Sequence, residues 1–167
     1  KEDFPIKFRM DLSFDQCLIS GLYVNKRKMF FTVLYRNPKN NSQSPEFQLF
    51  LQNFERLYTN IRLESPYASF FTGDFNSHNK IWFSDGDTNS EGILIDDLFS
   101  RLGLTQLIKE PTHYFRDDCI PSCIDLIVTD QPNLVLESGV HSSLDPTVKH
   151  QLIFCKINAK IPRPTNF

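Results

Sequence analysis

The segment that most constrains the fold is an apolar, β-prone run at residues 67–72 that ends in Gly73-Asp74-Phe75-Asn76. Side chains alternate along an extended strand, so Asp74 and Asn76 are predicted to project to the same side. The glycine before them lets the backbone turn where the strand ends. A carboxylate and a carboxamide placed there can hold a water molecule and a phosphate together. Asp and Asn are also ordinary turn residues, so the segment by itself is equally compatible with a plain turn.

The composition is that of an ordinary globular domain. The 167 residues are enough for one domain with a substantial core, and 40% are hydrophobic while 23% are charged. The formal net charge of −2 excludes a wholly basic nucleic-acid binder, so any DNA contact has to be local. Lys26-Arg27-Lys28 and the pair Lys7 and Arg9 are the basic candidates, although a basic hairpin tip is more often a solvated turn.

Cysteine spacing and hydropathy exclude two further classes of protein. Cys119 and Cys123 lack the second ligand pair of a zinc site, so reduced thiols of an intracellular protein are expected. No run approaches the roughly 20 apolar residues that a membrane helix needs, and no signal peptide is visible. We therefore expect no membrane partner.

The remaining pattern predicts strands interrupted by two helices. Ser44 and Pro45 predict the start of a helix whose apolar residues recur at three-and-four spacing as far as Ile61. A second helix is expected at about 91–102, capped by Asn89 or Ser90 and ended by Gly103. Strands are expected at residues 17–24 and 29–35, which form a hairpin, and near 104–107, 124–129, 134–139 and 151–157.

Two polar residues lie within or just before apolar, strand-like runs. Asp125 lies within the apolar run 124–128, where a carboxylate is expensive to bury without a partner. His150 precedes the apolar run 152–154, and its position alone is equally typical of a polar strand start. With Asp125 available as a partner, we interpret the two as a functional pair.

Five motifs follow one another in a fixed order. They are Tyr35-Arg36-Asn37-Pro38, then residues 73–79 followed by Trp82, then Glu110-Pro111-Thr112-His113, then Ser122-Cys123-Ile124-Asp125, and finally residues 141–146 with Lys149-His150-Gln151. This series resembles the endonuclease/exonuclease/phosphatase superfamily, and within it the endonuclease domains of non-LTR retrotransposons. The resemblance extends from about Leu34 to Ile157.

The resemblance implies an α/β (α+β) fold. The expected architecture is a partial four-layer αββα sandwich, in which helices flank two packed mixed β-sheets. Residues 1–157 would form this domain without its N-terminal strands, and residues 158–167 would form a linker toward an absent C-terminal region. In the retrotransposon proteins such a linker leads to a reverse transcriptase, which is therefore an expected partner in cis.

The resemblance also implies a role for each catalytic candidate. Asp74 would position or deprotonate the attacking water, and Asn76 would hold Asp74 and a phosphate oxygen. His150 would donate to a non-bridging phosphate oxygen, while Asp125 would accept from the other ring nitrogen and fix its tautomer. Tyr35 would place a phenol near the phosphate or the leaving group, although a strand-end Tyr is usually a half-buried aromatic. Asp74 and Asn76 are also the expected metal ligands, for Mg2+ or alternatively Mn2+.

DNA is the expected partner of this site. The residues expected to contact it are Arg36, Asn37, His78 and Lys149. His78 is equally compatible with a surface loop, whereas His113 and His141 are interpreted as structural or DNA-proximal. Trp82 is expected to pack beneath the loop rather than to stack on a base.

The chain departs from the superfamily pattern in two places. The first metal site of the superfamily takes an Asn and a Glu from strands well before the motif tyrosine, but only 34 residues precede Tyr35. The principal metal Glu is therefore expected to be absent from this chain. Many relatives also carry Ser-Asp-His where this chain has Val148-Lys149-His150, and Lys149 cannot ligate a cation as a carboxylate would.

These patterns predict a magnesium-dependent DNA-nicking endonuclease of a mobile element, intracellular, and nuclear when it acts on DNA. The segment alone is expected to be inactive, because a metal carboxylate is missing. Two alternatives stay open: a non-catalytic relic or DNA-binding domain of the same fold, and a phosphodiesterase or phosphatase acting on a phosphoinositide or phospholipid head group. The motifs at residues 110–113 and 141–151 favour the mobile-element group, and therefore favour DNA as the substrate.

Overall fold

The computed structural model describes residues 6–14, 17–24, 27–114, 120–143, 145 and 147–158. In chain order the elements are β1 (Ile6–Phe8), β2 (Cys17–Val24), β3 (Arg27–Tyr35), α1 (Pro45–Leu63), β4 (Ala68–Asp74), α2 (Ser90–Leu102), β5 (Thr105–Gln106), β6 (Asp125–Thr129), the short 3₁₀ helix η1 (Pro132–Leu134), β7 (Val135–His141) and β8 (Leu152–Ile157).

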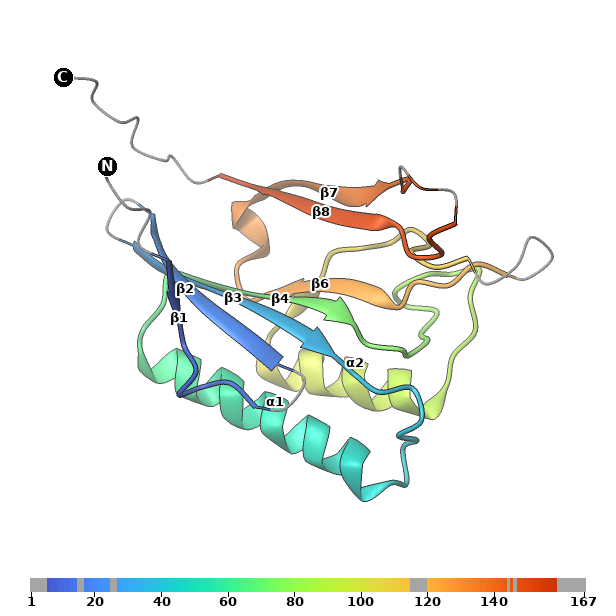
Figure 1. The fold of residues 1–167 in the computed structure, drawn as a ribbon, viewed down its shortest axis with the longest axis horizontal. Helices are drawn as coiled ribbons and strands as arrows, with labels where there is room; N and C mark the ends of the chain where they lie inside the picture. The colour runs from blue at the N-terminus through green and yellow to red at the C-terminus, as the bar shows by residue number, and fades with distance from the viewer. Residues whose placement is uncertain are drawn as a thin grey trace.

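The strands form two sheets that face each other. The larger has the order β1-β2-β3-β4-β6-β5, and within it β3 and β4 are parallel while the other neighbours are antiparallel. Helices α1 and α2 cover one face of this sheet, and the β7–β8 pair lies over the other (Figure 1). The expected mixed α/β fold with two sheets and flanking helices is confirmed. Within the described residues the second sheet is one antiparallel pair rather than a mixed sheet, and the helices lie on one side only.

Both helices begin and end where local sequence predicts. The Ser44 side chain accepts a hydrogen bond from the Phe47 amide at the start of α1, with Pro45 in the first turn. The Asn89 side chain caps α2, and Gly103 ends it in the left-handed conformation at φ 67°. The aromatic stripe of α1 is buried against the sheet, where Phe54 packs 5.0 Å from Phe71 between ring centroids. Burial of this stripe fixes the helical layer on the sheet.

Gly73 sets the distance between β3 and β4 at the end that carries the polar motifs. Its φ of +142° lies in a region that favours glycine, and a Cβ there would lie 1.8 Å from the Leu34 carbonyl oxygen. The two parallel strands can therefore approach closely only with glycine at this position. Tyr35 and Asp74 become register partners one residue farther along.

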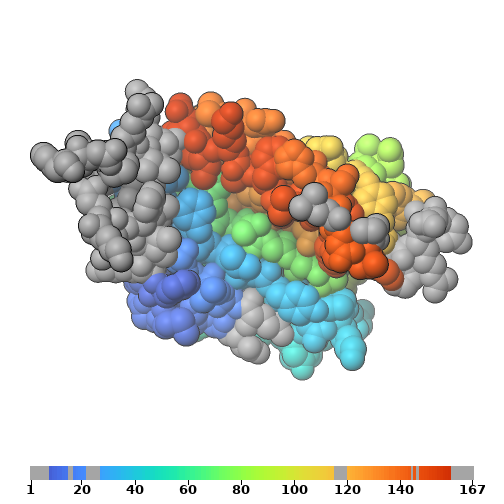
Figure 2. Space-filling view, turned by 45° about the horizontal axis from the view of Figure 1, so that its top comes forward, coloured from blue at the N-terminus to red at the C-terminus, as the bar shows by residue number. Residues whose placement is uncertain are grey.

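The part of the chain that the structure describes covers only half of one face of the larger sheet. Strands β7 and β8 lie beside, rather than over, the blue surface of β2 and β3 in Figure 2. Leu18 and Val33 are register partners on this open face, and their side chains are 45% and 53% exposed. Farther into the same face, Phe31 and Phe70 stack with ring centroids 5.4 Å apart. The result is an apolar surface beside the covered half of the sheet.

The predicted hairpin is confirmed by the register of β2 with β3, but its basic residues are not all in a turn. Arg27 and Lys28 belong to β3, where Arg27 lies 4.2 Å over the ring of Tyr67 and Lys28 pairs with Glu64. Lys26, Cys119 and all but the first residue of the predicted linker at 158–167 lie outside the described residues. Within the described ranges, no helix has the length and apolar character that crossing a membrane requires.

Candidate active site

The candidate site lies where β3 and β4 end and β6 begins (Figure 1). Tyr35 pairs with Asp74 across the parallel strands, and Asp74 pairs with Asp125 across the antiparallel ones. Register partners project to the same face of a sheet, so the three side chains form one row. Three segments that are distant in sequence therefore present polar groups at the same end of the central strands β3, β4 and β6.

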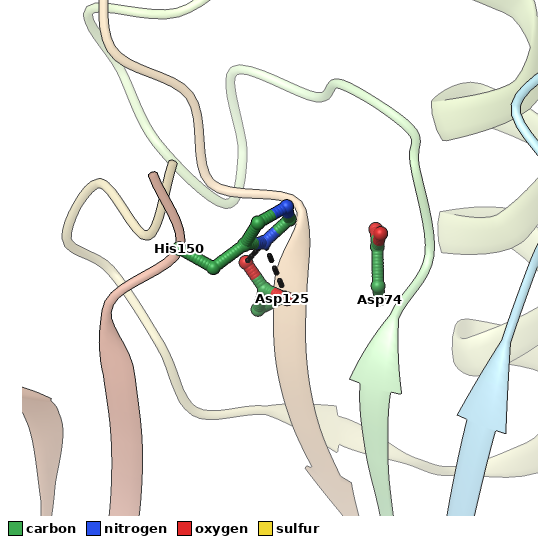
Figure 3. A group of neighbouring side chains, drawn as sticks. All are labelled: Asp74, Asp125 and His150. Carbon is green, nitrogen blue, oxygen red and sulfur yellow. Dashed lines mark hydrogen bonds and ion pairs between the residues drawn. The ribbon is translucent and has the colours of Figure 1, made fainter. Parts of the chain in front are cut away.

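Asp125 and His150 form the pair that the sequence predicts. Nδ1 of His150 lies 3.0 Å from Oδ2 and 3.2 Å from Oδ1 of Asp125 (Figure 3). The Asp125 side chain is 14% exposed, whereas that of His150 is 44% exposed. An Nδ1–H that donates to the carboxylate leaves Nε2 directed away from it, as Figure 3 shows for the second ring nitrogen. Nε2 is then the atom available to a substrate.

Thr112 fixes the start of β6 and was not singled out from the sequence. Its buried hydroxyl accepts hydrogen bonds from the amides of Ile124 and Asp125, at 3.1 and 3.0 Å. Its carbonyl accepts from the amide of Gln151, next to His150, at 2.7 Å. Thr112 thus joins the two segments that carry Asp125 and His150. These contacts give the motif at residues 110–113 a structural role beside the site.

His113 extends the same connection. Its backbone forms an antiparallel bridge with His150, and the two imidazole centroids are 4.6 Å apart. Burial lowers the pKa of His113, and the neighbouring His150 lowers it further. A neutral His113 ring therefore packs against the His150 ring at neutral pH. The sequence indicated only a structural or DNA-proximal role for His113, and the structure places it beside the site.

Asp74 and Asn76 lie together at the end of β4. The Asn76 amide donates to Oδ1 of Asp74 at 2.8 Å, and the Asn76 side-chain Nδ2 donates to Oδ2 at 2.9 Å. Burial raises the pKa of Asp74, and the charge of Asp125 adds to this increase, whereas the Asn76 hydrogen bonds and His150 oppose it. The net effect is a carboxylate with more affinity for a proton than an exposed Asp. Asn76 holds this group in one orientation.

The donor set fits a hard divalent cation. Asp74, Asp125 and His150 each offer a ligand atom, and these atoms lie within 4.8 Å of one another. Carboxylate and amide oxygens are the ligands that Mg2+ and Mn2+ prefer. Nδ2 of Asn76 donates to Asp74 and to the Arg36 carbonyl, so Oδ1 of Asn76 is the amide atom left to face a cation. Asp125 is an additional carboxylate beyond the two expected ligands.

Arg36 is buried, whereas its predicted contact with DNA requires a side chain at the surface. The residue is 2% exposed, and its guanidinium donates to main-chain carbonyls of the 74–76 loop and of residues 37 and 40. Burial lowers the pKa of Arg36, although the nearby carboxylates of Glu91 and Asp74 oppose this decrease. The structure therefore places Arg36 beneath the site rather than on its surface.

The remaining predicted residues lie around the rim. Tyr35 is 47% exposed at the end of the row that contains Asp74. Asn37 is half-buried and accepts from the Lys39 amide, and His78 is half-buried with a pKa lowered by burial. Lys149 is exposed directly before His150. Direct contact of these residues with DNA stays a prediction.

Trp82 packs beneath the loop as expected. Its ring is 1% exposed and lies 6.2 Å from that of Phe99, measured between centroids. Its Nε1 donates to the Asp96 carboxylate at 2.8 Å, which satisfies the polar end of the indole. The ring is therefore part of the core and unavailable for stacking on a base.

The family comparison agrees with this geometry. Residues 29–153 match the model of a protein family described as endonuclease-reverse transcriptase. No curated protein matches the chain. The matched range contains the whole row of polar side chains together with His150.

Several solved structures share the fold. The endonuclease domain of TRAS1, a telomere-specific non-LTR retrotransposon, superposes with a TM-score of 0.77 at 18% identity, over 94% of this chain and 70% of that chain. A 3′ phosphatase from Neisseria bound to a product DNA hairpin gives 0.59 at 17% identity, over 93% and 70%. An AP endonuclease from Archaeoglobus fulgidus gives 0.59 at 12% identity, over 92% and 70%. At these identities the likeness establishes the endonuclease/exonuclease/phosphatase fold.

Proposed function

Because the chain belongs to the endonuclease-reverse transcriptase family, we propose that it is most of a divalent-metal-dependent endonuclease domain that nicks DNA for a non-LTR retrotransposon. The observation that carries this proposal is the pairing of His150 with Asp125 next to the Asp74–Asn76 pair. Phosphodiester hydrolysis needs an activated water, stabilisation of charge on the phosphoryl group and assistance to the leaving oxygen. The site offers groups suited to the first two requirements within one cluster.

Asp74 is the proposed base. A general base works best when its pKa lies near the operating pH, and in the protein without a bound cation burial moves the pKa of Asp74 upward from the ordinary value of an Asp. The two hydrogen bonds from Asn76 hold the carboxylate while it accepts the proton of the attacking water. Both N–H groups of the Asn76 side chain are engaged, one with Asp74 and one with the Arg36 carbonyl, so Asn76 serves the reaction by holding Asp74.

His150 is the proposed phosphate contact. With Nδ1–H donating to Asp125, Nε2–H of the protonated ring can donate to a non-bridging oxygen as negative charge develops there. Asp125 holds the ring in place without itself moving a proton. Tyr35 projects to the same face and offers its phenol to the phosphate or the leaving group.

Asp74 and Asn76 are the proposed cation ligands, and Mg2+ or Mn2+ bound there would neutralise charge on the phosphoryl group and assist the leaving oxygen. Asp74 and Asp125 are the two carboxylates in the cluster found among the described residues. We propose that a further metal carboxylate comes from protein outside this chain. The open apolar face around Leu18 and Val33 supports this proposal, because additional strands of the domain would cover it.

The wider biological setting is part of the same proposal. The family description supports a reverse transcriptase in cis. An enzyme of this kind acts on chromosomal DNA, so we propose that it works in the nucleus.

Supercoiled-plasmid nicking tests the proposal. The 167-residue chain and a version extended at its N-terminus would be assayed with Mg2+, each beside an Asp74→Ala variant and an EDTA control. We expect nicking only by the extended wild type with metal present. Equal nicking by the shorter chain would contradict the need for an additional carboxylate, and absence of nicking by both would contradict the nuclease assignment.

A further inference from the structure

Arg36 is a buried cation whose hydrogen bonds end on the loop that carries Asp74 and Asn76. Its Nε donates to the Phe75 carbonyl at 2.5 Å, and its Nη2 donates to the Asn76 carbonyl. Nη1 donates to the carbonyls of Asn40 at 2.7 Å and of Asn37 at 3.1 Å. The planar fork of a guanidinium can make all these contacts at once, which a lysine ammonium cannot do in the same geometry.

The backbone of Arg36 completes the contact with this loop. Its amide donates to the Asp74 carbonyl at 2.9 Å, and its carbonyl accepts from Nδ2 of Asn76 at 2.8 Å. Arg36 therefore holds the carbonyls of Asp74, Phe75 and Asn76 in succession. It also bonds the same amide group that orients the Asp74 carboxylate.

The loop needs such support because of its conformation. Asn76 has a φ of 46°, which is in the left-handed region that a residue with a side chain adopts infrequently. The chain has left the β4 ladder at this point, so the carbonyls of Phe75 and Asn76 require other donors. The guanidinium donates to both carbonyls from beneath, where the ring centroid of Phe47 lies 5.5 Å from its Cζ, and the Ser77 hydroxyl also donates to the Phe75 carbonyl.

Burial separates this role from a contact with DNA. Phosphate contacts come from side chains that reach the surface, whereas Arg36 is 2% exposed and four of its contacts are with main-chain oxygens. An Arg side chain released toward a phosphate would take one donor from each of these carbonyls, and only Phe75 and Asn37 would keep a described donor, from the Ser77 hydroxyl and the Asn40 amide.

We propose that Arg36 is a positioning residue, which acts on the reaction by holding Asp74 and Asn76 in their catalytic orientation. This inference rests on the proposed nuclease function. It means that Arg36, in the motif at residues 35–38, fixes the geometry of the motif at residues 73–79. The consequence is that Arg36 affects the rate of the chemical step more than the affinity for DNA.

The test compares Arg36→Lys with Arg101→Lys, which changes an exposed arginine on α2, in a version of the protein that nicks DNA. We expect Arg36→Lys to lower kcat by about tenfold to a hundredfold, because small displacements of catalytic groups have effects of that size. The KM for DNA and the salt dependence of binding should stay unchanged, as should every parameter of Arg101→Lys. A raised KM with a reduced salt slope and unchanged kcat would instead identify a DNA contact and overturn the proposal.

A second variant tests the specific chemistry of the fork. In Arg36→Ala, added guanidinium should restore part of the lost kcat by occupying the vacated site, whereas ammonium at the same concentration should not. Equal restoration by both ions, or by neither in a variant whose thermal unfolding shows a native fold, would contradict the proposal.

Hydrogen exchange separates this inference from the nuclease assignment. In the 167-residue chain without DNA or metal, Arg36→Lys should speed amide exchange at residues 74–76, where the Asn76 amide is bonded to Asp74. Exchange in α2 should not change. If the loop exchanges faster and the N-terminally extended wild type fails to nick, the function is wrong while the structural role of Arg36 stands. If exchange at 74–76 is unaltered, the positioning role is wrong whatever the activity.

Discussion

Asp74 and Asp125 face each other as register partners across β4 and β6. Two carboxylates in such positions repel, and the charge of Asp125 contributes to the raised pKa of Asp74. His150 lies beside both groups and pairs with Asp125, so the row gains a cationic partner when the ring is protonated. The arrangement gives the two carboxylates different tasks through their different neighbours.

Asp125→Asn tests the pair formed with His150. The amide keeps the volume of the carboxylate but presents a different hydrogen-bond pattern to Nδ1, so the ring loses its tautomer and its charged partner. We expect the nicking rate to fall about 10²–10⁴-fold. The matched control is Asp97→Asn, because Asp97 is an exposed carboxylate on α2 that pairs with Arg101. A wild-type rate for Asp125→Asn would remove this pair from the mechanism.

Gly73→Ala tests the close approach of β3 and β4. The added Cβ would lie 1.8 Å from the Leu34 carbonyl oxygen, on a backbone whose φ is +142°. We expect the free energy of unfolding to fall by about 3 kcal/mol or more, measured by urea denaturation. Gly103→Ala is the control, since Gly103 has a φ of +67° and open space around its Cβ position. Its expected cost is only about 1 kcal/mol, and equal losses for the two variants would contradict the contact with Leu34.

Glu64 links pH to stability at the end of α1. Burial alone would raise its pKa, but hydrogen bonds from Lys28 and Arg9 outweigh this effect and lower the pKa below its ordinary value of 4.5. A lowered folded-state pKa contributes stability above pH 4.5, and this contribution is lost as the pH falls through the folded-state pKa.

Thermal unfolding of Glu64→Gln checks this linkage. At pH 7 the variant should melt about 2–4 °C below the wild type, and the difference should shrink below pH 4.5 and disappear once the pH lies below the folded-state pKa of Glu64. Glu55→Gln, which changes a more exposed carboxylate on α1, should leave the melting temperature unaltered. A difference that persists unchanged at low pH would show that Glu64 stabilises the chain by something other than its charge.

The open face of β2 and β3 gives a prediction that depends on the surrounding protein. Leu18→Thr with Val33→Thr removes two exposed apolar side chains from adjacent strands. In the 167-residue chain the double variant should bind less of an apolar dye and should be more soluble, while Ile93→Thr on α2 should change neither.

The same substitutions should act differently in the N-terminally extended protein. If additional strands cover this face, the double variant should lose about 1–3 kcal/mol of stability there, because the two side chains are then buried. An unchanged stability in the extended protein would mean that the added segment packs elsewhere.

Local features of this protein follow from the sequence. The caps at Ser44 and Asn89, the end of α2 at Gly103 and the buried face of α1 depend on contacts within a few residues, which spacing in the chain encodes. The partnership of Asp125 with His150 was also predictable, because a carboxylate in an apolar strand requires a partner. The order of the motifs then identified the family that the comparison shows.

Other features were decided only by the tertiary structure. A guanidinium suits a DNA phosphate and a group of main-chain carbonyls equally well, so the burial of Arg36 beneath the 74–76 loop could not be read from its position in a motif. The connection of Thr112 to Ile124 and Asp125 depends on where a distant segment lies against β6. The half-covered sheet likewise depends on how β7 and β8 pack. In each case the sequence specifies a chemical capacity, and long-range packing determines which partner satisfies it.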